Sequence, residues 1–315
     1  MRACLGALLV LMTGGSGLMA QSFDFTAGTQ SFFTESGIPV IFRVPKQEPG
    51  PVQEVVSLRI SAFGGVELTE KAGALDLLSG LLMRGTYSYS KDQIDDLLTR
   101  TGARLSVSAD QDSVELSLRC LRRFLPELLP LVSEIVRVPK MEERELKLLI
   151  EQQVAALKSE QDRPESVIAL KMNQIFFSGH PYQRRPSGYL ESIREIKRED
   201  LHSLLFRTFN RQNVVVTLVG DFQVEEVKAL IDEHFRSLPE GQRTNPTRAI
   251  PNNDFSQTHF TSFNSPTTYF LARFKSPALD DEDFPALTIG MQILHNRLFE
   301  EVRTNRGLAY SVSAR

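Results

Sequence analysis

The sequence is 315 residues long, with 41% hydrophobic and 24% charged residues, a composition that predicts one large or two medium packed domains rather than a disordered chain. Its 36 Lys and Arg residues nearly balance 39 Asp and Glu residues, so the formal net charge is −3. This balance gives no overall basic character of the kind that binds nucleic acid or an anionic membrane, and we expect neither as a partner.

The N-terminal residues have the pattern of a secretory signal peptide. Arg2 is followed by an apolar run over residues 5–12 and then by small residues that end at Ala20. The apolar run is too short to span a bilayer, so we predict a signal peptide over residues 1–20 and an exported protein, periplasmic or extracellular. A buried N-terminal strand or helix is the alternative interpretation.

The two cysteines predict no disulfide. Cys4 lies within the predicted signal peptide, which leaves Cys120 alone in the mature chain. Cys120 belongs to a run of alternating apolar and polar residues at 113–121, and we interpret it as a small core residue rather than a reactive thiol.

The first part of the chain alternates strand and helix patterns. The predicted elements are strands within residues 34–45 and 54–65, helices at 69–84 and 90–102, and a hairpin at 103–120. Thr69 is the expected N-cap of the first helix. Ser90 and Gly102 are the expected cap and stop of the second, and the hairpin is expected to turn at residues 109–112.

Helices dominate the next part of the chain. The predicted elements are helices at 124–137, 141–160, 164–177 and 197–209, a buried strand at 213–222, and a helix at 224–238. Together with the preceding elements they predict an α+β domain over residues 21–240, in which an antiparallel sheet has helices packed on one face.

A linker and an incomplete second domain are expected at the C-terminal end. Residues 241–254 are poor in apolar residues and rich in Pro, Asn and charge, which is typical of a linker. Residues 255–315 then predict one strand at 267–277, one helix at 285–306 and part of another strand at 307–315. One helix and two strand segments cannot bury a core of their own. We therefore expect this second domain to be truncated.

No residue pattern in the chain predicts a complete catalytic site. The five histidines never stand at helical i, i+4 spacing, and neither His-x-x-Glu-His nor His-Glu-x-x-His occurs. Gly-x-Ser-x-Gly and a glycine-rich phosphate loop are also absent from the sequence. The absence of these motifs argues against an enzyme that acts by itself, although an unrecognised site is one hypothesis for the function.

The order of elements resembles the pitrilysin/insulinase family of zinc peptidases. The stretch LRISAFGGVELTEKAGALDLLSGLLMRGT, at residues 58–86, is similar to the family's opening segment, where a helix carries His-x-x-Glu-His and ends in a basic residue followed by Gly-Thr. Aligning that ending on Arg84 to Thr86 puts Asp76 and Gly80 where the two histidines stand and Ser79 where the catalytic glutamate stands. The resemblance extends over roughly residues 30–315, through GHPYQRRPSGYLESIREIKREDLHSLLFRTFNRQNVVVTLVGDF and RLFEEVRTNRGLAYSV.

This resemblance implies a chain without its own zinc site. Two histidines at i and i+4 lie about 5 to 6 Å apart at Cβ and can converge on one ion, whereas Asp76, Ser79 and Gly80 supply one carboxylate, one hydroxyl and no side chain. The family's third ligand, a glutamate on a later helix, aligns with Glu151 or Gln152. Neither assignment rescues a tetrahedral zinc site, so we expect no metal on this chain. Whether a weak ion binds near Asp76 does not follow from the sequence.

The resemblance also implies two homologous domains and a role for Arg303 and Tyr310, seven residues apart. In the family's two-subunit bacterial members, a noncatalytic subunit presents such an arginine and tyrosine to a peptide substrate bound at the zinc ion of its partner. We therefore expect a noncatalytic, substrate-binding subunit of an exported zinc peptidase, with zinc on a homologous partner. The alternative hypothesis is a structural scaffold with a peptidase-like fold and no catalytic role.

Overall fold

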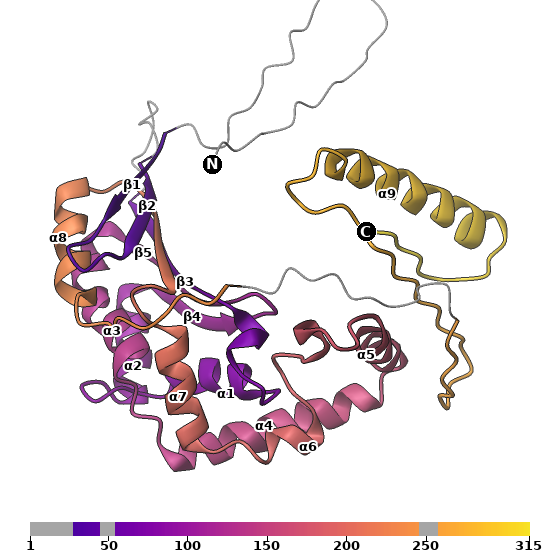
Figure 1. Ribbon diagram of the computed structural model, residues 1–315, viewed down its shortest axis with the longest axis horizontal. Coiled ribbons are helices and arrows are strands. Elements are labelled where there is room, and N and C mark those ends of the chain that lie inside the picture. Colours follow the sequence, from indigo (N-terminus) through magenta and orange to yellow (C-terminus); the bar gives the residue numbers. More distant parts are fainter. Residues whose placement is uncertain (1–27, 45–53, 246–257) are drawn as a thin grey trace, which may run out of the picture. The chain divides into compact units, whose positions relative to one another are not determined.

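The computed structural model of the chain describes residues 28–44, 54–245 and 258–315 (Figure 1). The predicted signal peptide at 1–20 and the 246–254 part of the predicted linker lie outside the described residues. None of the described helices is both long and apolar enough to cross a membrane.

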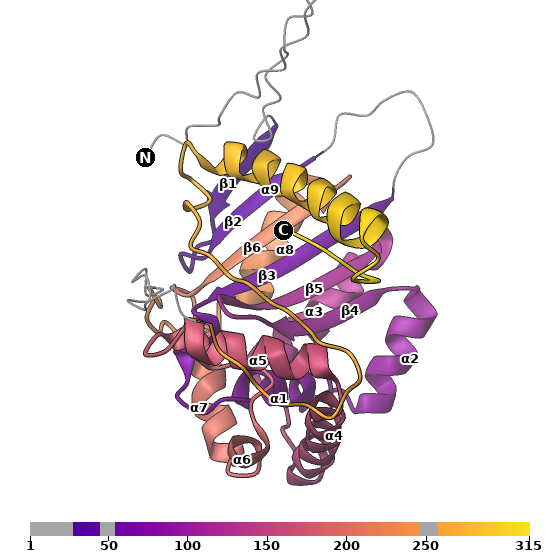
Figure 2. The same cartoon turned by 90° about the vertical axis from the view of Figure 1, so that its right-hand side faces the viewer.

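The chain divides into two compact units. The larger covers Gly28–Leu271, and the described part of the smaller covers Ala272–Arg315. A sheet in the order β1-β2-β6-β3-β5-β4 runs through the larger unit (Figure 2). Its strands are β1 (Thr29–Phe33), β2 (Pro39–Arg43), β3 (Val55–Phe63), β4 (Arg104–Ala109), β5 (Ser113–Leu121) and β6 (Val214–Gly220).

The predicted α+β fold is confirmed, with one departure from an antiparallel sheet. Every neighbouring pair of strands is antiparallel except β2 and β6, which run parallel with Val40 opposite Val216. A parallel pair needs a long crossover connection, and here most of the larger unit lies between these two strands in the sequence.

The sheet is one-sided because its strands alternate apolar and polar residues. In β3, Val56, Leu58 and Ile60 are fully buried or nearly so, whereas Ser57 and Arg59 between them are exposed. Successive side chains of a strand point to opposite faces, so the described helices of the larger unit lie over one face and leave the other, open face uncovered (Figures 1 and 2).

The described helices of the larger unit pack on this sheet or on one another. They are α1 (Ala74–Leu82), α2 (Lys91–Thr101), α3 (Leu125–Arg137), α4 (Glu143–Gln161), α5 (Pro164–Phe176), α6 (Leu190–Ile193), α7 (Arg198–Thr208) and α8 (Val224–Phe235). Helix α1 packs against β4, α4 and α7, while α3 packs against α8. The Ser133 hydroxyl of α3 donates a 2.6 Å hydrogen bond to the His234 carbonyl of α8. Helix α1, the one that resembles the zinc-motif helix, is therefore held on several sides.

The predicted start of α1 is wrong. The helix begins at Ala74 and follows Gly73, whose φ of 99° lies in the left-handed region. A separate 3₁₀ turn at Gly65–Leu68 precedes it, and the Thr69 hydroxyl accepts a hydrogen bond from the Lys71 N–H instead of capping α1. The left-handed backbone at Gly73 interrupts the helical path that the apolar spacing suggested.

Two other local predictions are confirmed. Ser90 and Gln93 form a reciprocal capping box at the start of α2, and Gly102 ends that helix in the left-handed conformation. The hairpin turns where expected, because the Asp110 carboxylate accepts hydrogen bonds from the backbone N–H groups of Asp112 and Ser113.

Toward the C-terminal end the predicted helix is confirmed but the predicted strands are not. Helix α9 (Phe284–Leu298) continues into a π-helical segment, Phe299–Asn305. Residues 267–277 and 307–315 are not strands in the described structure, because no neighbouring strand there supplies hydrogen-bond partners. Strand β1, by contrast, is absent from the predictions, because its polar sequence carries little strand signal and pairing with β2 defines it.

Candidate functional site

The face of α1 that would carry zinc ligands is filled by an apolar side chain of α4. A Cβ atom added to Gly80 would lie 3.2 Å from Cδ2 and 3.4 Å from Cδ1 of Leu149. A side chain at position 80 therefore requires the Leu149 side chain to shift by a few tenths of an ångström. Gly80 has no side chain, and Leu149 packs against the space that a side chain there would occupy.

Ser79 is buried beside Gly80 and does no visible chemistry. Its side chain is 5% exposed, and its hydroxyl has no hydrogen-bond partner among the described residues. A buried hydroxyl without a partner destabilises the folded state. It is also too short to act in place of a glutamate as a base on a metal-bound water.

Asp76 supplies the remaining polar group on this face of α1. Burial raises the pKa of its carboxyl, an effect that the Arg185 guanidinium opposes and the Glu160 carboxylate reinforces. Arg185 itself donates 2.7 Å hydrogen bonds to Glu160 Oε2 and to the Ser187 hydroxyl. The Asp76 carboxyl is therefore near the Arg185–Glu160 ion pair, and it is the only carboxylate among the three motif positions.

The helix α4 residues predicted to align with a third ligand also fail to complete a metal site. Glu151 and Gln152 are both exposed, and Gln152 Oε1 accepts a 3.5 Å hydrogen bond from Arg84 Nη2. Among the described residues, no group of three or more His, Cys, Asp or Glu side chains is arranged to hold a metal ion. The residues present do not fit a zinc ion, and no step of chemistry on this chain is derived through one.

The part of the motif that survives has a structural role. Gly85 has a φ of 128°, which favours glycine, and Thr86 is buried. The Thr86 and Ser88 hydroxyls donate hydrogen bonds of 2.6 and 2.7 Å to the Glu134 carboxylate of α3. The Gly-Thr turn therefore anchors the end of α1 to α3. The sequence patterns gave no signal for Glu134, which lies 48 residues beyond Thr86.

The structure brings Arg303 and Tyr310 together in the smaller unit. The Arg303 guanidinium carbon lies 5.0 Å from the Tyr310 ring centroid and 4.7 Å from that of Phe299, within the range of cation–π contacts. Tyr310 is 87% exposed, and Arg303 is exposed as well. Both polar groups are accessible to a ligand.

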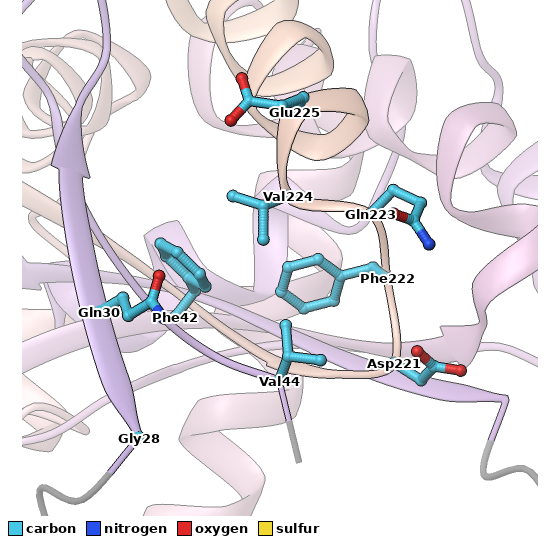
Figure 3. A pocket seen from close by; sticks show the side chains of 9 residues that line it. All are labelled: Gly28, Gln30, Phe42, Val44, Asp221, Phe222, Gln223, Val224 and Glu225. Atoms are coloured by element: carbon cyan, nitrogen blue, oxygen red, sulfur yellow. The ribbon is translucent and has the colours of Figure 1, made fainter. Parts of the chain in front are cut away.

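A cavity of about 450 Å³ lies elsewhere in the larger unit, between β1, β2 and the start of α8 (Figure 3). The rings of Phe42 and Phe222 form its wall, and the carboxylates of Asp221 and Glu225 lie at its rim, pointing away from the rings. Asp221 pairs with Arg122 at 3.6 Å. The cavity presents neither a nucleophile nor a set of metal ligands.

Two family models match the chain. The one described as "Insulinase (Peptidase family M16)" matches residues 55–186, and the one described as "Peptidase M16 inactive domain" matches residues 195–315. The chain belongs to the M16 family. The expected resemblance to pitrilysin/insulinase peptidases of the type that lacks the zinc motif is therefore confirmed.

Relatives within the family include proteins named as peptidases and one named as a non-peptidase. The chain is 24% identical to the non-peptidase homolog YmxG of Helicobacter pylori, over 92% of this chain and 67% of that protein. It is 26% identical to an uncharacterized zinc protease of Mycobacterium leprae, over 76% of this chain and 56% of that protein. The chain thus spans between about half and two thirds of the length of these relatives.

Solved structures share the fold. A crystal structure of a peptidase M16 inactive domain from Pseudomonas fluorescens superposes with a TM-score of 0.77 at 24% identity, covering 90% of this chain and 69% of that one. The periplasmic protease PqqL from Escherichia coli superposes with a TM-score of 0.59 at 15% identity, covering 71% of this chain and 25% of PqqL.

Proposed function

We propose that this chain is the noncatalytic, substrate-binding subunit of an exported two-subunit zinc peptidase. One observation carries the proposal: the zinc-motif face of α1 lacks metal ligands and has Leu149 packed against Gly80, while Arg303 and Tyr310 lie together and exposed. In this assignment zinc, the activated water and the general base belong to a homologous partner subunit. Peptide substrate binds between the two chains.

The chemistry of the two side chains suits that role. A guanidinium presents fixed donors to substrate carbonyl groups, and it remains charged at any physiological pH. A tyrosine hydroxyl can donate a hydrogen bond to the oxyanion that develops on the scissile carbonyl, where a positioned donor has its largest effect on rate. The Arg303 guanidinium lies over the Tyr310 ring, so both polar groups can reach one substrate.

An unpaired sheet edge supports a peptide as the substrate. Among the described strands, β4 pairs only with β5, and α1 packs beside it. Such an edge has free backbone N–H and C=O groups to which an extended peptide can add as another strand. Binding of this kind uses main-chain hydrogen bonds and therefore accepts many sequences.

The names of relatives support a paired arrangement and export. Helicobacter pylori has both the non-peptidase homolog YmxG and a zinc protease PqqE, which is 23% identical to this chain over 233 residues. A further relative, 22% identical over 213 residues, is the beta subunit of the Neurospora crassa mitochondrial-processing peptidase. PqqL is a periplasmic protease, which agrees with the predicted signal peptide at residues 1–20.

Reconstitution tests the proposal. The purified chain is mixed with the zinc-motif homologue from the same organism, Zn²⁺ and a quenched fluorescent peptide, and kcat/KM is measured for the mixture and for each chain alone. We expect activity in the mixture only. Tyr310→Phe should lower kcat by about 100-fold, as removal of an oxyanion donor does, and Arg303→Ala should lower kcat/KM by at least about 10-fold.

Matched variants test whether activity depends on Arg303 and Tyr310 in particular or on any nearby arginine and tyrosine. Arg306→Ala removes a neighbouring guanidinium that pairs with Glu301, and Tyr269→Phe removes the hydroxyl of another partly exposed tyrosine; both should retain activity. Activity that depends on the mixture but not on Arg303 or Tyr310 would favour the scaffold hypothesis. Peptide cleavage by this chain alone would favour an independent active site and contradict the proposal.

A further inference from the structure

The open face of the sheet has an unusual composition. It carries the serine hydroxyls of Ser57, Ser61, Ser106, Ser108 and Ser117. Four arginines share the face, and Glu115 is the only acidic residue in any of the described strands. Glu115 already pairs with Arg59 at 3.4 Å. The overall net charge of −3 therefore hides a locally basic surface.

Three of these arginines stand in one row across the sheet. The strand register puts Arg104 opposite Arg119, Arg119 opposite Ser57, Ser57 opposite Val219 and Val219 opposite Arg43. All three arginines are exposed, and no carboxylate among the described residues pairs with any of them. The row thus presents three guanidinium groups whose donors are available.

The Arg104–Arg119 pair is unfavourable in the chain by itself. Side chains directly opposite on neighbouring antiparallel strands have Cβ atoms about 4.5–5.5 Å apart, and like charges at that separation destabilise a sheet. Elsewhere on the same face the chain places an opposite charge across the strands, as Arg59 and Glu115 show. An anionic group bound between Arg104 and Arg119 would turn this repulsion into two charge-assisted hydrogen bonds.

We propose that this row binds an acidic segment of the peptide substrate, through Asp or Glu side chains or a C-terminal carboxylate. The inference rests on the proposed function and names the class of substrate. A guanidinium matches the planar geometry of a carboxylate, and the neighbouring serine hydroxyls can donate to the same group. No aromatic side chain stands in the row, so the bases of a nucleic acid find no stacking surface there.

Direct binding to the isolated chain tests the inference. Fluorescence anisotropy is measured with labelled peptides of about twelve residues that are rich in Glu, Gln or Lys, and with a single-stranded oligonucleotide. We expect the Glu-rich peptide to bind tightest and its Kd to weaken as salt rises from about 50 to 200 mM, since exposed charges are screened over that range. Arg104→Gln combined with Arg119→Gln should weaken its binding by at least about 10-fold.

A control with the same change in net charge is available. Arg144 on α4 and Arg236 after α8 are exposed and lie off the sheet, so Arg144→Gln with Arg236→Gln should change Kd less than about 2-fold if position matters. Arg43→Gln, in the third position of the row, gives an independent variant should the double change perturb folding. Circular dichroism and the thermal midpoint check that each variant is folded.

The outcomes are distinct. Equal binding of Glu-rich and Gln-rich peptides, an unchanged Kd in the sheet variants, or tighter binding of the oligonucleotide would overturn the inference. Because this assay contains no zinc partner, it is independent of reconstituted activity. Loss of acidic-peptide binding with intact dependence on Arg303 and Tyr310 rejects only the substrate class, whereas an inactive mixture with intact binding rejects only the proposed subunit role.

Discussion

Asp76, Ser79 and Gly80 fail as a metal site for three different physical reasons. Asp76 is a carboxyl whose pKa is raised by burial and which adjoins Arg185. Ser79 has a buried hydroxyl without a partner among the described residues, and Gly80 has its side-chain volume taken by Leu149. Restoring one residue would leave the other two obstacles in place.

Ser79→Ala should leave the free energy of unfolding unchanged or raise it by up to about 1 kcal/mol, because it removes an unsatisfied buried hydroxyl. Urea denaturation followed by circular dichroism measures the change. Ser133→Ala is the matched control, since its hydroxyl donates to His234 and its loss should destabilise by about 1 kcal/mol. A marked loss of stability in Ser79→Ala would show that the hydroxyl has a partner after all.

Gly80→His should destabilise the fold by about 1–3 kcal/mol, because the imidazole has to displace the Leu149 side chain that packs against position 80. Adding Leu149→Ala should recover part of that loss by opening the space. Isothermal titration of the Asp76→His, Ser79→Glu, Gly80→His variant should detect no tight Zn²⁺ binding while Leu149 is present. Tight binding that also stabilises this variant would contradict the packing argument.

At this scale the resemblance predicts which positions correspond to the zinc motif, but not which side chains of other helices surround them. Alignment on Arg84 to Thr86 locates positions 76, 79 and 80 through local spacing alone. Leu149 and Glu134 lie far along the chain on other helices, and no periodicity links them to α1. Contacts between distant segments depend on the packing of helices, which a single sequence does not reveal.

Among the elements, the junction of α1 and α3 should show a characteristic pH dependence. Burial raises the pKa of Glu134, but hydrogen bonds from Thr86 and Ser88 lower it more, so the net pKa lies below the ordinary value. Its contribution to stability is therefore complete above the unfolded pKa of about 4.3 and disappears as pH falls through the folded pKa.

Glu134→Gln should lower the free energy of unfolding by about 1.5 kcal/mol at neutral pH, because the hydrogen bonds to a charged acceptor are weakened. The difference from wild type should shrink toward zero as pH falls below the folded pKa. Urea denaturation of both proteins over a range of acidic pH values measures it. A constant difference across that range would show that the carboxylate charge is not involved.

Strand pairing gives a further prediction. Arg104→Gln should raise the free energy of unfolding by about 0.2–1 kcal/mol at low salt, because it removes a like-charge pair directly across from Arg119. The gain should diminish at high salt, where the repulsion in wild type is screened. Destabilisation by this change would mean that an anionic partner within the chain already neutralises Arg104.

Element types were predictable wherever the signal was local. The Ser90 cap, the Gly102 stop and the Asp110 turn are set by side chains close in sequence, and all three are confirmed. Strand β1 and residues 267–277 were not predicted correctly, because a strand forms only when a neighbouring strand supplies its hydrogen-bond partners. Thr29–Phe33 has β2 beside it, whereas the described part of the smaller unit supplies no strand partner.

For the molecule as a whole, Cys120 offers a reporter of global unfolding. It is 4% exposed on the buried face of β5, and burial raises the pKa of its thiol to about 11. Since the thiolate is the reactive form, native protein should resist alkylation at neutral pH. In a Cys4→Ser variant, the labelling rate at increasing urea should follow the unfolding transition seen by circular dichroism. Rapid labelling of native protein would indicate local opening near β5 instead.

Family and fold class were predictable for the whole molecule because they depend on the order of elements and on segments such as Arg84 to Thr86 that resemble the family's motifs. The order of the strands in the sheet was not predictable. Neither composition nor periodicity shows that β6 lies between β2 and β3 rather than at an edge of the sheet. The domain boundaries predicted at residues 240 and 255 and the predicted signal peptide remain predictions.

The central position of β6 has a consequence for synthesis on the ribosome. This strand is the last of the six to be made, yet it joins the β1–β2 ribbon to the β3–β5–β4 ribbon. Until Val214–Gly220 has emerged, both ribbons have open inner edges, and apolar residues such as Val40 and Ile60 lack their neighbours. Until β6 is made, the nascent chain therefore exposes unpaired strand edges, which promote aggregation.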